Sequence, residues 1–480
     1  MIKGFFGTIA ALAAGAGIAA GQSPFVPPPT PISPAMNYGE VQPAEFNVPQ
    51  QVIPPQFGQG GPGGPGGPGG MMDGPPGLTG PNGMPSYPPP GQYGAQSYES
   101  AINPNRASPT GVSHYYLTFD YLLWSVSAQP SNVPYVTTSA PSDRGLAGRA
   151  TTALLYSNTD LGYGLSSGFR VTGGWFKGED RRYGYEISGF SLEQKSNSYF
   201  AQSANNGVPV LSRPFIDATS GGPAVLTISQ PNLANGNILV STSNRIFGAE
   251  VSGIVNVYRG CPTDGARFTA NGLLGFRFME IDEKLEISSA STLLGGGAPL
   301  FNGLPVFAPG TITVQDGFHA VNRFYGGQAG FQTELRYSRY TFGFTGKVAV
   351  GVMNQTLDIT GQSALLDPTR GLAQVALGGV YANSMNIGRY RNDEFAVVPE
   401  FSGTFGYNWT SWLTTSVGYN FLYANRVLRP GNSFSDRVNP AVLPTSQNFG
   451  TGSVAPVVNR ALTQDELFAQ GVTFSLLMKY

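Results

Sequence analysis

The sequence predicts an all-β fold: a closed antiparallel transmembrane β-barrel of about ten strands, preceded by a disordered N-terminal segment rich in Pro and Gly. Three observations support this prediction. Large apolar residues alternate repeatedly with small or polar ones, short connections alternate with long ones, and the chain ends on Tyr480 within such an alternating run. Beyond its first segment the chain has no apolar run of ~18 residues, which excludes transmembrane helices.

Residues 1–20 have the pattern of a secretory signal peptide. Lys3 precedes an apolar stretch that runs from Gly4 to Ile18, and the small residues Ala19 and Ala20 follow it. We expect cleavage after one of these two alanines. The mature protein is therefore predicted to be exported.

Residues 21–112 are predicted to be a disordered tether. This stretch holds 22 of the 39 prolines and includes GQGGPGGPGGPGG at 58–70. Because it has few large apolar side chains, burial cannot offset the chain entropy that folding would cost. We expect a spacer through which the protein could contact peptidoglycan or another periplasmic partner.

Period-two alternation places the strands within residues 113–480. In the stretch 340–352, Phe342, Phe344 and Val350 share one face of a strand, whereas Lys347 lies on the other. Similar runs predict ten strands, at 114–127, 167–176, 182–196, 243–257, 266–288, 316–336, 340–360, 390–408, 411–428 and 464–480.

The connections between these strands alternate strictly in length. Short turns are expected at 177–181, 259–265, 337–339 and 409–411, and long loops at 128–166, 197–242, 289–315, 361–389 and 429–463. Outer-membrane barrels have short periplasmic turns and long extracellular loops, whereas a β-sandwich has no reason to alternate them. The count would be twelve if a long loop concealed a hairpin, for which 232–244 is the strongest candidate.

Aromatic residues gather near the short turns and the C-terminus. They are Tyr183, Tyr185, Tyr258, Tyr337, Tyr340, Tyr407, Trp409, Trp412 and Tyr480. We expect them to form a girdle at one membrane interface, where amphipathic rings meet lipid headgroups. The alternative is that tyrosine is simply common in strands.

The polar face of each strand is predicted to line the lumen. The lumen-facing candidates are Asp120, Arg170, Glu186, Glu250, Arg277, Glu334, Arg336, Lys347 and Glu400, together with Lys479. A ten-stranded barrel is only slightly wider than the ~8-stranded barrels whose interior side chains just fill. Since an unpaired charge is costly in so narrow a space, we expect ion pairs. A filled lumen is therefore favoured over a conducting pore.

Several stretches resemble a family of outer-membrane β-barrel porins known mainly from planctomycete bacteria. They include YLTFDYLLWSV (116–126), FRVTGGWF (169–176), NRFYGGQAGF (322–331) and VGYNFLYANRVLRPGN (417–432). The resemblance covers about 113–480. It implies a barrel fold and an outer-membrane location, but no established transport activity and no catalytic residues.

The last nine residues, VTFSLLMKY, are predicted to be the final barrel strand. Phe474, Leu476 and Met478 should face lipid, with Tyr480 at the interface. A terminal strand of this kind resembles the assembly signal that the barrel-insertion machinery reads in outer-membrane proteins. The partners expected are therefore outer-membrane lipid and that machinery.

Composition weighs against several other functions. The formal net charge is −1 with scattered Lys and Arg, so no nucleic-acid partner is expected. One cysteine, Cys261, and two histidines, His114 and His319, leave little material for a metal site. We expect no cofactor, no metal and no enzymatic activity.

Three functions compete on this evidence. The first is an outer-membrane barrel with a structural, surface or small-solute-passage role. The second is a surface hydrolase similar to the omptins, with Asp316, His319, Asp393 and Glu394 at the extracellular rim and His319 as general base. The third is a secreted β-sandwich adhesin, against which the turn lengths and the terminal aromatic argue.

Overall fold

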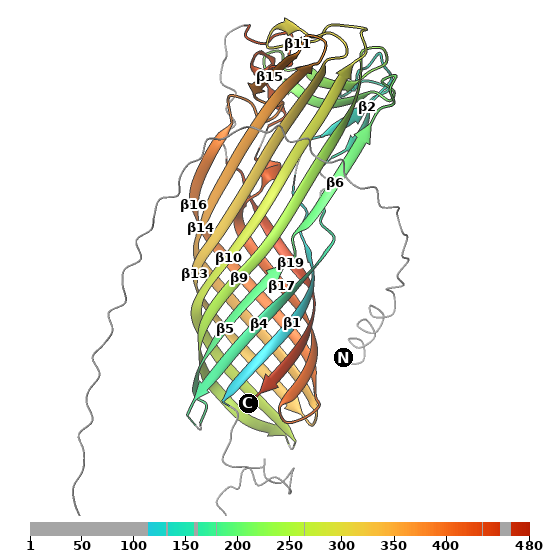
Figure 1. Cartoon of the computed structure of the whole chain (residues 1–480). Helices are drawn as coiled ribbons and strands as arrows, with labels where there is room; N and C mark the ends of the chain where they lie inside the picture. The colour runs from blue at the N-terminus through green and yellow to red at the C-terminus, as the bar shows by residue number, and fades with distance from the viewer. Residues whose placement is uncertain are drawn as a thin grey trace, which may run out of the picture. The chain divides into compact units, whose positions relative to one another are not determined.

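The fold is a ring of ten antiparallel strands topped by folded loops (Figure 1). A computed structural model describes residues 114–480, apart from 131–132, 158–161, 179, 264, 434 and 452–461. The strands of the ring are β1 (Tyr115–Val126), β4 (Leu165–Lys177), β5 (Tyr183–Leu192), β9 (Ala234–Thr263), β10 (Ala266–Leu293), β13 (Thr311–Tyr337), β14 (Tyr340–Asp367), β16 (Gly388–Asn408), β17 (Leu413–Leu428) and β19 (Gln464–Lys479).

The ring closes where the first strand meets the last. Each of the ten strands pairs with its neighbour in chain order, and β19 pairs with β1. The N–H of Tyr115 donates to the carbonyl of Tyr480 at 3.1 Å, and the N–H of Tyr480 donates back at 2.8 Å. Closure gives every barrel strand a partner on both sides, as hydrocarbon surroundings require. The predicted closed ten-stranded ring is confirmed.

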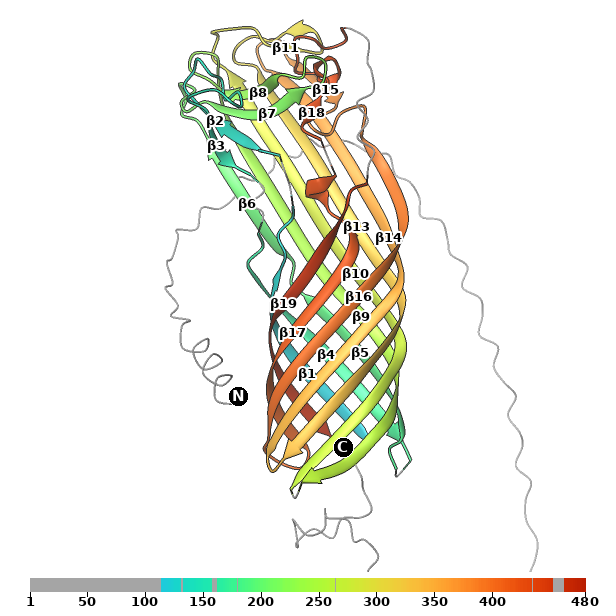
Figure 2. The same ribbon diagram turned by 180° about the vertical axis from the view of Figure 1, so that it is seen from behind.

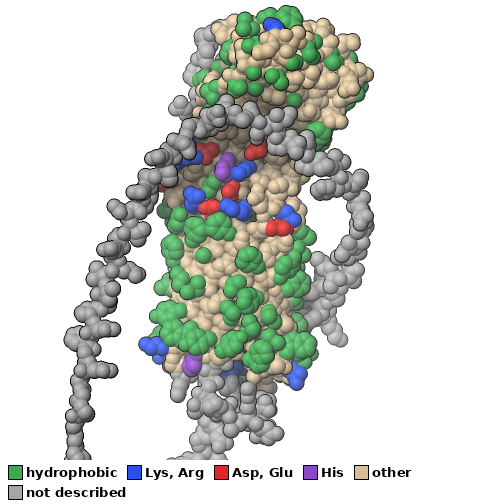
Figure 3. All heavy atoms as spheres, viewed as in Figure 1, with side chains coloured by type: hydrophobic (Ala, Val, Ile, Leu, Met, Phe, Trp, Pro, Cys, Tyr) green, Lys and Arg blue, Asp and Glu red, His purple; other side chains and the backbone are tan. Residues whose placement is uncertain are grey.

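The two faces of each strand differ as the alternation predicts. On β14, Phe344 and Val350 face outward and are 44% and 47% exposed, whereas Lys347 faces inward and is 9% exposed. On β1, Phe119 and Tyr121 face outward in the same way. Figure 3 shows hydrophobic side chains spread over the lower barrel, with charged side chains above them. This band is the lipid-facing surface of the barrel.

The predicted aromatic positions lie on this outer surface, close to the short turns. Tyr340 stacks on Phe405 with ring centroids 5.9 Å apart, and Tyr407 contacts Trp409 edge-on at 4.8 Å. Both pairs flank the turns that join β13 to β14 and β16 to β17. Their clustering at one level agrees with a girdle rather than with tyrosines scattered along the strands.

Four neighbouring strands extend far beyond their predicted ends. β9, β10, β13 and β14 have 30, 28, 27 and 28 residues and continue past the barrel (Figure 1). By contrast, β17 and β19 have 16 residues each and stop well short of the loops (Figure 2). The predicted strands were too short because the apolar alternation stops at the edge of the lipid band. The backbone hydrogen bonds between the strands continue beyond that edge.

The alternative of a further hairpin at 232–244, which would have raised the count to twelve barrel strands, does not hold. From Ala234 onward these residues form the first part of β9 itself, which pairs there with β6 (Lys195–Gln202). The predicted strand 182–196 is correspondingly split, since β5 ends at Leu192 and β6 begins at Lys195. β6 and β15 (Leu372–Leu377) extend the same sheet to twelve strands without entering the ring.

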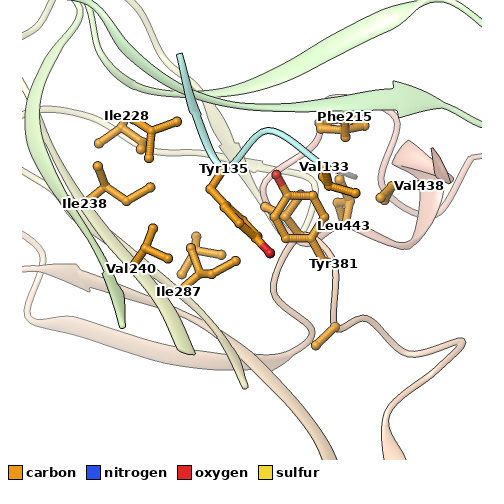
Figure 4. Close-up of a cluster of buried hydrophobic side chains, with 14 of the residues drawn as sticks. Val133, Tyr135, Phe215, Ile228, Ile238, Val240, Ile287, Tyr381, Val438 and Leu443 are labelled. Atoms are coloured by element: carbon orange, nitrogen blue, oxygen red, sulfur yellow. The ribbon is translucent and has the colours of Figure 1, made fainter. Parts of the chain in front are cut away.

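The long connections fold together into a compact body at one end of the barrel, called the crown here. Its further elements are β2 (Val136–Thr138), β3 (Ala153–Tyr156), β7 (Leu211–Asp217), β8 (Pro223–Ser229), β11 (Leu300–Phe301), β12 (Leu304–Pro305), β18 (Arg437–Val438) and the 3-10 helices η2 (Pro430–Asn432) and η3 (Pro440–Val442). In Figure 4, Tyr135 lies between Ile238 and Val240 of β9 on one side and Phe215 of β7 and Val438 of β18 on the other. The crown therefore has a hydrophobic core of its own.

Within the described residues, no helix has the length and apolar character that crossing a membrane requires. The signal peptide at 1–20 and the tether at 21–112 lie outside the described residues. Both therefore stay predictions from the sequence.

Candidate functional site: the barrel lumen

Six charged side chains from six strands meet inside the barrel. Arg277 of β10 contacts Glu250 of β9 at 2.6 Å and Glu400 of β16 at 2.5 Å. Glu400 also pairs with Arg170 of β4 at 2.7 Å, and Lys347 of β14 pairs with Glu250. The members of this lumen network are Arg170, Glu186, Glu250, Arg277, Lys347 and Glu400. It contains cations and carboxylates in equal number.

The network crosses the lumen instead of following the wall. β4 and β16 are not neighbours in the ring, and neither are β5 and β14, which are linked by Glu186 and Lys347 at 3.5 Å. None of the six side chains is more than 16% exposed. Desolvation of so many charges is costly, so their mutual pairing is what makes the arrangement tolerable. Together they join strands on opposite sides of the barrel.

Two further residues of β1 border the network. The hydroxyl of Tyr116 donates to Glu186 at 2.6 Å, and its ring lies over Gly174, where any Cβ atom would stand 2.1 Å from the ring. Gly174 therefore gives the ring the space it needs to reach Glu186. Asp120 lies directly across from Arg170 in the register of β1 and β4.

A polar cavity of about 520 Å³ extends from the network to the short-turn end of the barrel. Glu334, Arg336 and Lys479 lie near its mouth, where Glu334 contacts Arg336 at 3.1 Å and Lys479 at 3.9 Å. Of the predicted lumen residues, those that line the cavity are Asp120, Arg170, Glu186, Glu250, Glu334, Arg336, Lys347, Glu400 and Lys479. Arg277 joins them through the network.

An apolar layer fills the lumen on the crown side of the network. Trp124, Phe324 and Met353 are fully buried there, and the guanidinium of Arg170 lies 5.5 Å from the centre of the Trp124 ring. The layer consists of Leu122, Trp124, Val126, Leu192, Ile246, Met279, Ile281, Phe324, Ala349, Met353, Ala396, Val398, Leu422, Ala424, Val427, Leu467 and Ala469. Close packing of this kind leaves few voids larger than a water molecule.

A second buried ion pair lies beyond this layer, and the sequence analysis missed it. Arg429 contacts Glu283 through two hydrogen bonds, of 2.7 and 2.9 Å, and both side chains are at most 1% exposed. Arg429 also donates to the carbonyls of Ser127 and Ala128 at the end of β1. Two signals were available, since Glu283 shares the strand parity of Arg277 and Arg429 begins the RPGN stretch.

A third buried pair, Arg213 with Asp316, lies within the crown. Asp316 also accepts from the backbone N–H groups of Val380 at 3.2 Å and Ala382 at 2.6 Å. The Arg213 guanidinium lies 5.1 Å from the centre of the Tyr381 ring, and burial raises the pKa of that phenol. These contacts give Asp316 a structural position in the crown core.

The rim residues considered for hydrolysis are not brought together. Asp316 points inward to Arg213, whereas His319 points outward and hydrogen-bonds Asp282 at 2.8 Å. The reason is strand geometry, because residues three apart lie on opposite faces. On β16, Asp393 and Glu394 are adjacent and therefore also face opposite sides. The predicted arrangement, in which a carboxylate from this set orients His319, is not present.

The final strand lies as its alternation predicts. Phe474, Leu476 and Tyr480 are exposed on the outer face, and Met478 alternates in step with them. β19 pairs along its length with β1 and β17. The terminal residue thus contributes directly to the seam where the barrel closes.

Among solved structures, the chain is similar to the outer membrane protease OmpT from Escherichia coli, with 9% identity, a TM-score of 0.33, and coverage of 76% of this chain and 97% of that one. It is also similar to the CymD monoaromatic hydrocarbon channel, with 9% identity, a TM-score of 0.18, and coverage of 77% and 90%. No protein with a curated description matches the chain.

A family model described as "Putative beta barrel porin-7" matches residues 116–480, which include the whole ring apart from the first residue of β1. The match and the closed ring agree on one architecture. The chain belongs to the beta barrel porin-7 family and is an outer-membrane β-barrel protein.

Proposed function

We propose that the protein is a closed outer-membrane barrel that anchors and displays its crown at the cell surface. The observation that supports this role is the succession of layers across the lumen. The ion-pair network comes first, the apolar layer around Trp124 follows, and the pair of Arg429 with Glu283 lies beyond it. Surface display requires only that the barrel anchors the crown in the membrane. A filled lumen is therefore compatible with this role.

The free energy needed to separate buried ion pairs argues against frequent opening of the lumen. Removing one partner of a buried ion pair leaves an uncompensated charge and costs about 3–5 kcal/mol. A path through the lumen would have to separate several such pairs, including Arg277 from Glu400, and also part the apolar layer. Open states would therefore be rare.

The orientation follows from the connections. Short turns of outer-membrane barrels face the periplasm and long loops face outward, which puts the crown outside the cell. Export would use the signal peptide at 1–20, insertion would use the barrel-insertion machinery acting on β19, and the tether at 21–112 would lie in the periplasm, within reach of peptidoglycan. N-terminal sequencing of the mature protein, expected to begin after Ala19 or Ala20, tests the first step.

The proposal includes no catalytic role. Two contacts support this absence of a catalytic role from the proposal. Asp316 pairs with Arg213 in the crown core, and His319 hydrogen-bonds Asp282 on the outer surface of the barrel. Neither contact orients a base toward a shared substrate position.

Liposome swelling tests the role as a closed anchor against small-solute passage. Vesicles that contain the folded wild-type protein should shrink in hyperosmotic arabinose or glycine and not reswell faster than empty vesicles. The insertion control is the gel shift between unheated and boiled samples from the same vesicles. Fast, protein-dependent reswelling would favour solute passage and overturn the proposal.

A further inference from the structure

We propose that the polar cavity of the lumen binds a small neutral polyhydroxylated molecule, with the size and chemistry of a monosaccharide, which reaches it from the short-turn end. The cavity has a volume of about 520 Å³. Volumes of about 300–1,000 Å³ are typical of small-ligand sites. The apolar layer begins at Leu122, the next inward position of β1 after Asp120, so the cavity ends inside the barrel. Binding in the cavity is therefore compatible with a closed lumen.

The two halves of the cavity wall carry different side chains. On one half, the long charged side chains of the lumen network pair with one another. On the other half, the neighbouring strands β16, β17 and β19 contribute mainly hydroxyl groups. The members of this hydroxyl wall are Ser402, Thr404, Thr414, Ser416, Thr473 and Ser475. Because a hydroxyl both donates and accepts, the wall matches an uncharged ligand that does the same.

Part of the hydroxyl wall is open to a ligand. Thr414 donates to the side chain of Asn408 at 2.7 Å and is thereby engaged within the protein. By contrast, the hydroxyls of Ser402, Thr404 and Ser416 have no hydrogen-bond partner among the residues that the structure describes. These three groups come from two neighbouring strands, so one ligand can contact them together.

Strand β1 borders the hydroxyl wall with three different groups. Tyr116, Thr118 and Asp120 occupy successive inward positions and all line the cavity. Asp120 lies across from Ser475 in the register of β1 and β19, and Ser475 lies across from Ser416. The buried Oδ1 atom of Asp120 accepts no hydrogen bond from the described residues. An ionised carboxylate can only accept, so this atom requires a donor, which a ligand hydroxyl supplies.

The charges around Asp120 favour a neutral ligand. Arg170 lies across from Asp120 in the register of β1 and β4, and it pairs with Glu400 at 2.7 Å. A small cation at Asp120 would meet the positive charge of Arg170, whereas an anion would meet the carboxylates of Asp120 and Glu400. A neutral molecule with several hydroxyls avoids both repulsions.

Two aromatic rings provide an apolar surface beside these polar groups. Tyr116 and Phe176 both line the cavity, with ring centroids 6.1 Å apart. Small-ligand sites commonly combine such apolar contacts with a few placed polar groups. A sugar ring has C–H groups on its faces and hydroxyls at its edge, so it fits this combination better than a molecule that is polar throughout.

Calorimetric titration of the folded protein, in a detergent without a sugar headgroup, tests the site with D-glucose, D-galactose and D-arabinose as probes. We expect saturable binding of at least one of them. Its affinity should fall about tenfold or more in the Asp120→Asn/Ser416→Ala variant, which removes a charged acceptor and one open hydroxyl. The matched control is Ser243→Ala, which removes a hydroxyl from the outer face of β9, two residues from the exposed Arg245. The control should bind like the wild type.

The thermal midpoint supplies a second readout. The sugar that binds should raise it for the wild type and for Ser243→Ala, but much less for the double variant. The gel shift between unheated and boiled samples verifies that each variant is folded, and Ser416→Ala alone replaces the double variant if that does not fold. Three results would each overturn the inference: no saturable binding of any of the three sugars to the wild type, equal binding to wild type and variant, or saturable binding of sodium acetate in place of the sugars.

Discussion

Arg277 is the residue that ties the lumen network together. Its guanidinium contacts both Glu250 and Glu400, so it links β9 and β16 across the barrel through β10. At 5% exposure, little of its charge is left to water. When it is removed, Glu250 still pairs with Lys347 and Glu400 still pairs with Arg170.

Replacing Arg277 with Met should therefore destabilise the barrel strongly. We expect a loss of about 3–5 kcal/mol in the free energy of unfolding, because the buried network then holds three carboxylates against two cations and one negative charge is left uncompensated. Urea unfolding in detergent, followed by tryptophan fluorescence, measures it. The control Arg389→Met breaks an exposed pair with Asp358 and should cost at most about 1 kcal/mol. Equal effects of the two substitutions would contradict a buried network.

Residue parity was readable from the sequence, but the choice of partners was not. Alternation alone put Arg277, Lys347 and Glu400 on the inner faces of their strands. Which carboxylate each cation contacts depends on how the strands are tilted and staggered around the ring. This shear cannot be predicted from the sequence of any single strand. Arg429 shows the limit most clearly, since it lies after the end of β17, where parity no longer applies.

At the scale of elements, the lipid-facing part of each strand was the predictable part. β9 was expected at 243–257 and runs from Ala234 to Thr263. Its first residues include Asn235, Gly236 and Asn237, which are typical of a loop. The extension is stabilised instead by pairing with β6 and β10, which are distant in sequence, so local patterns could not reveal it.

The terminal strand gives a sharp prediction at this scale. Deleting Tyr480, or adding a charged tail after it, should lower the fraction of folded barrel severalfold, since Tyr480 exchanges two backbone hydrogen bonds with Tyr115 at the seam. The folded fraction is read from the gel shift between unheated and boiled outer-membrane preparations. Tyr480→Phe keeps both the ring and the backbone bonds and should assemble normally. An unchanged folded fraction after deletion of Tyr480 would show that the end of β19 has no special role in assembly of the barrel.

At the scale of the whole molecule, three buried charge groups and two hydrophobic cores follow one another along the axis of the fold. The lumen network, the apolar layer, the pair of Arg429 with Glu283 and the crown core with Arg213 and Asp316 leave little of the interior unfilled beyond the short-turn cavity. Closed topology was predictable from an even strand number and alternating turn lengths. The crown's packing was not, because its residues come from loops without periodicity.

Single-channel recording in planar bilayers tests the central claim, that side chains close the lumen. Wild-type protein, with insertion verified by its heat-dependent gel shift, should give no stepwise currents in 1 M KCl at about 100 mV. Uniform, repeated conductance steps from the folded wild type would show that ions cross the lumen and would contradict the account.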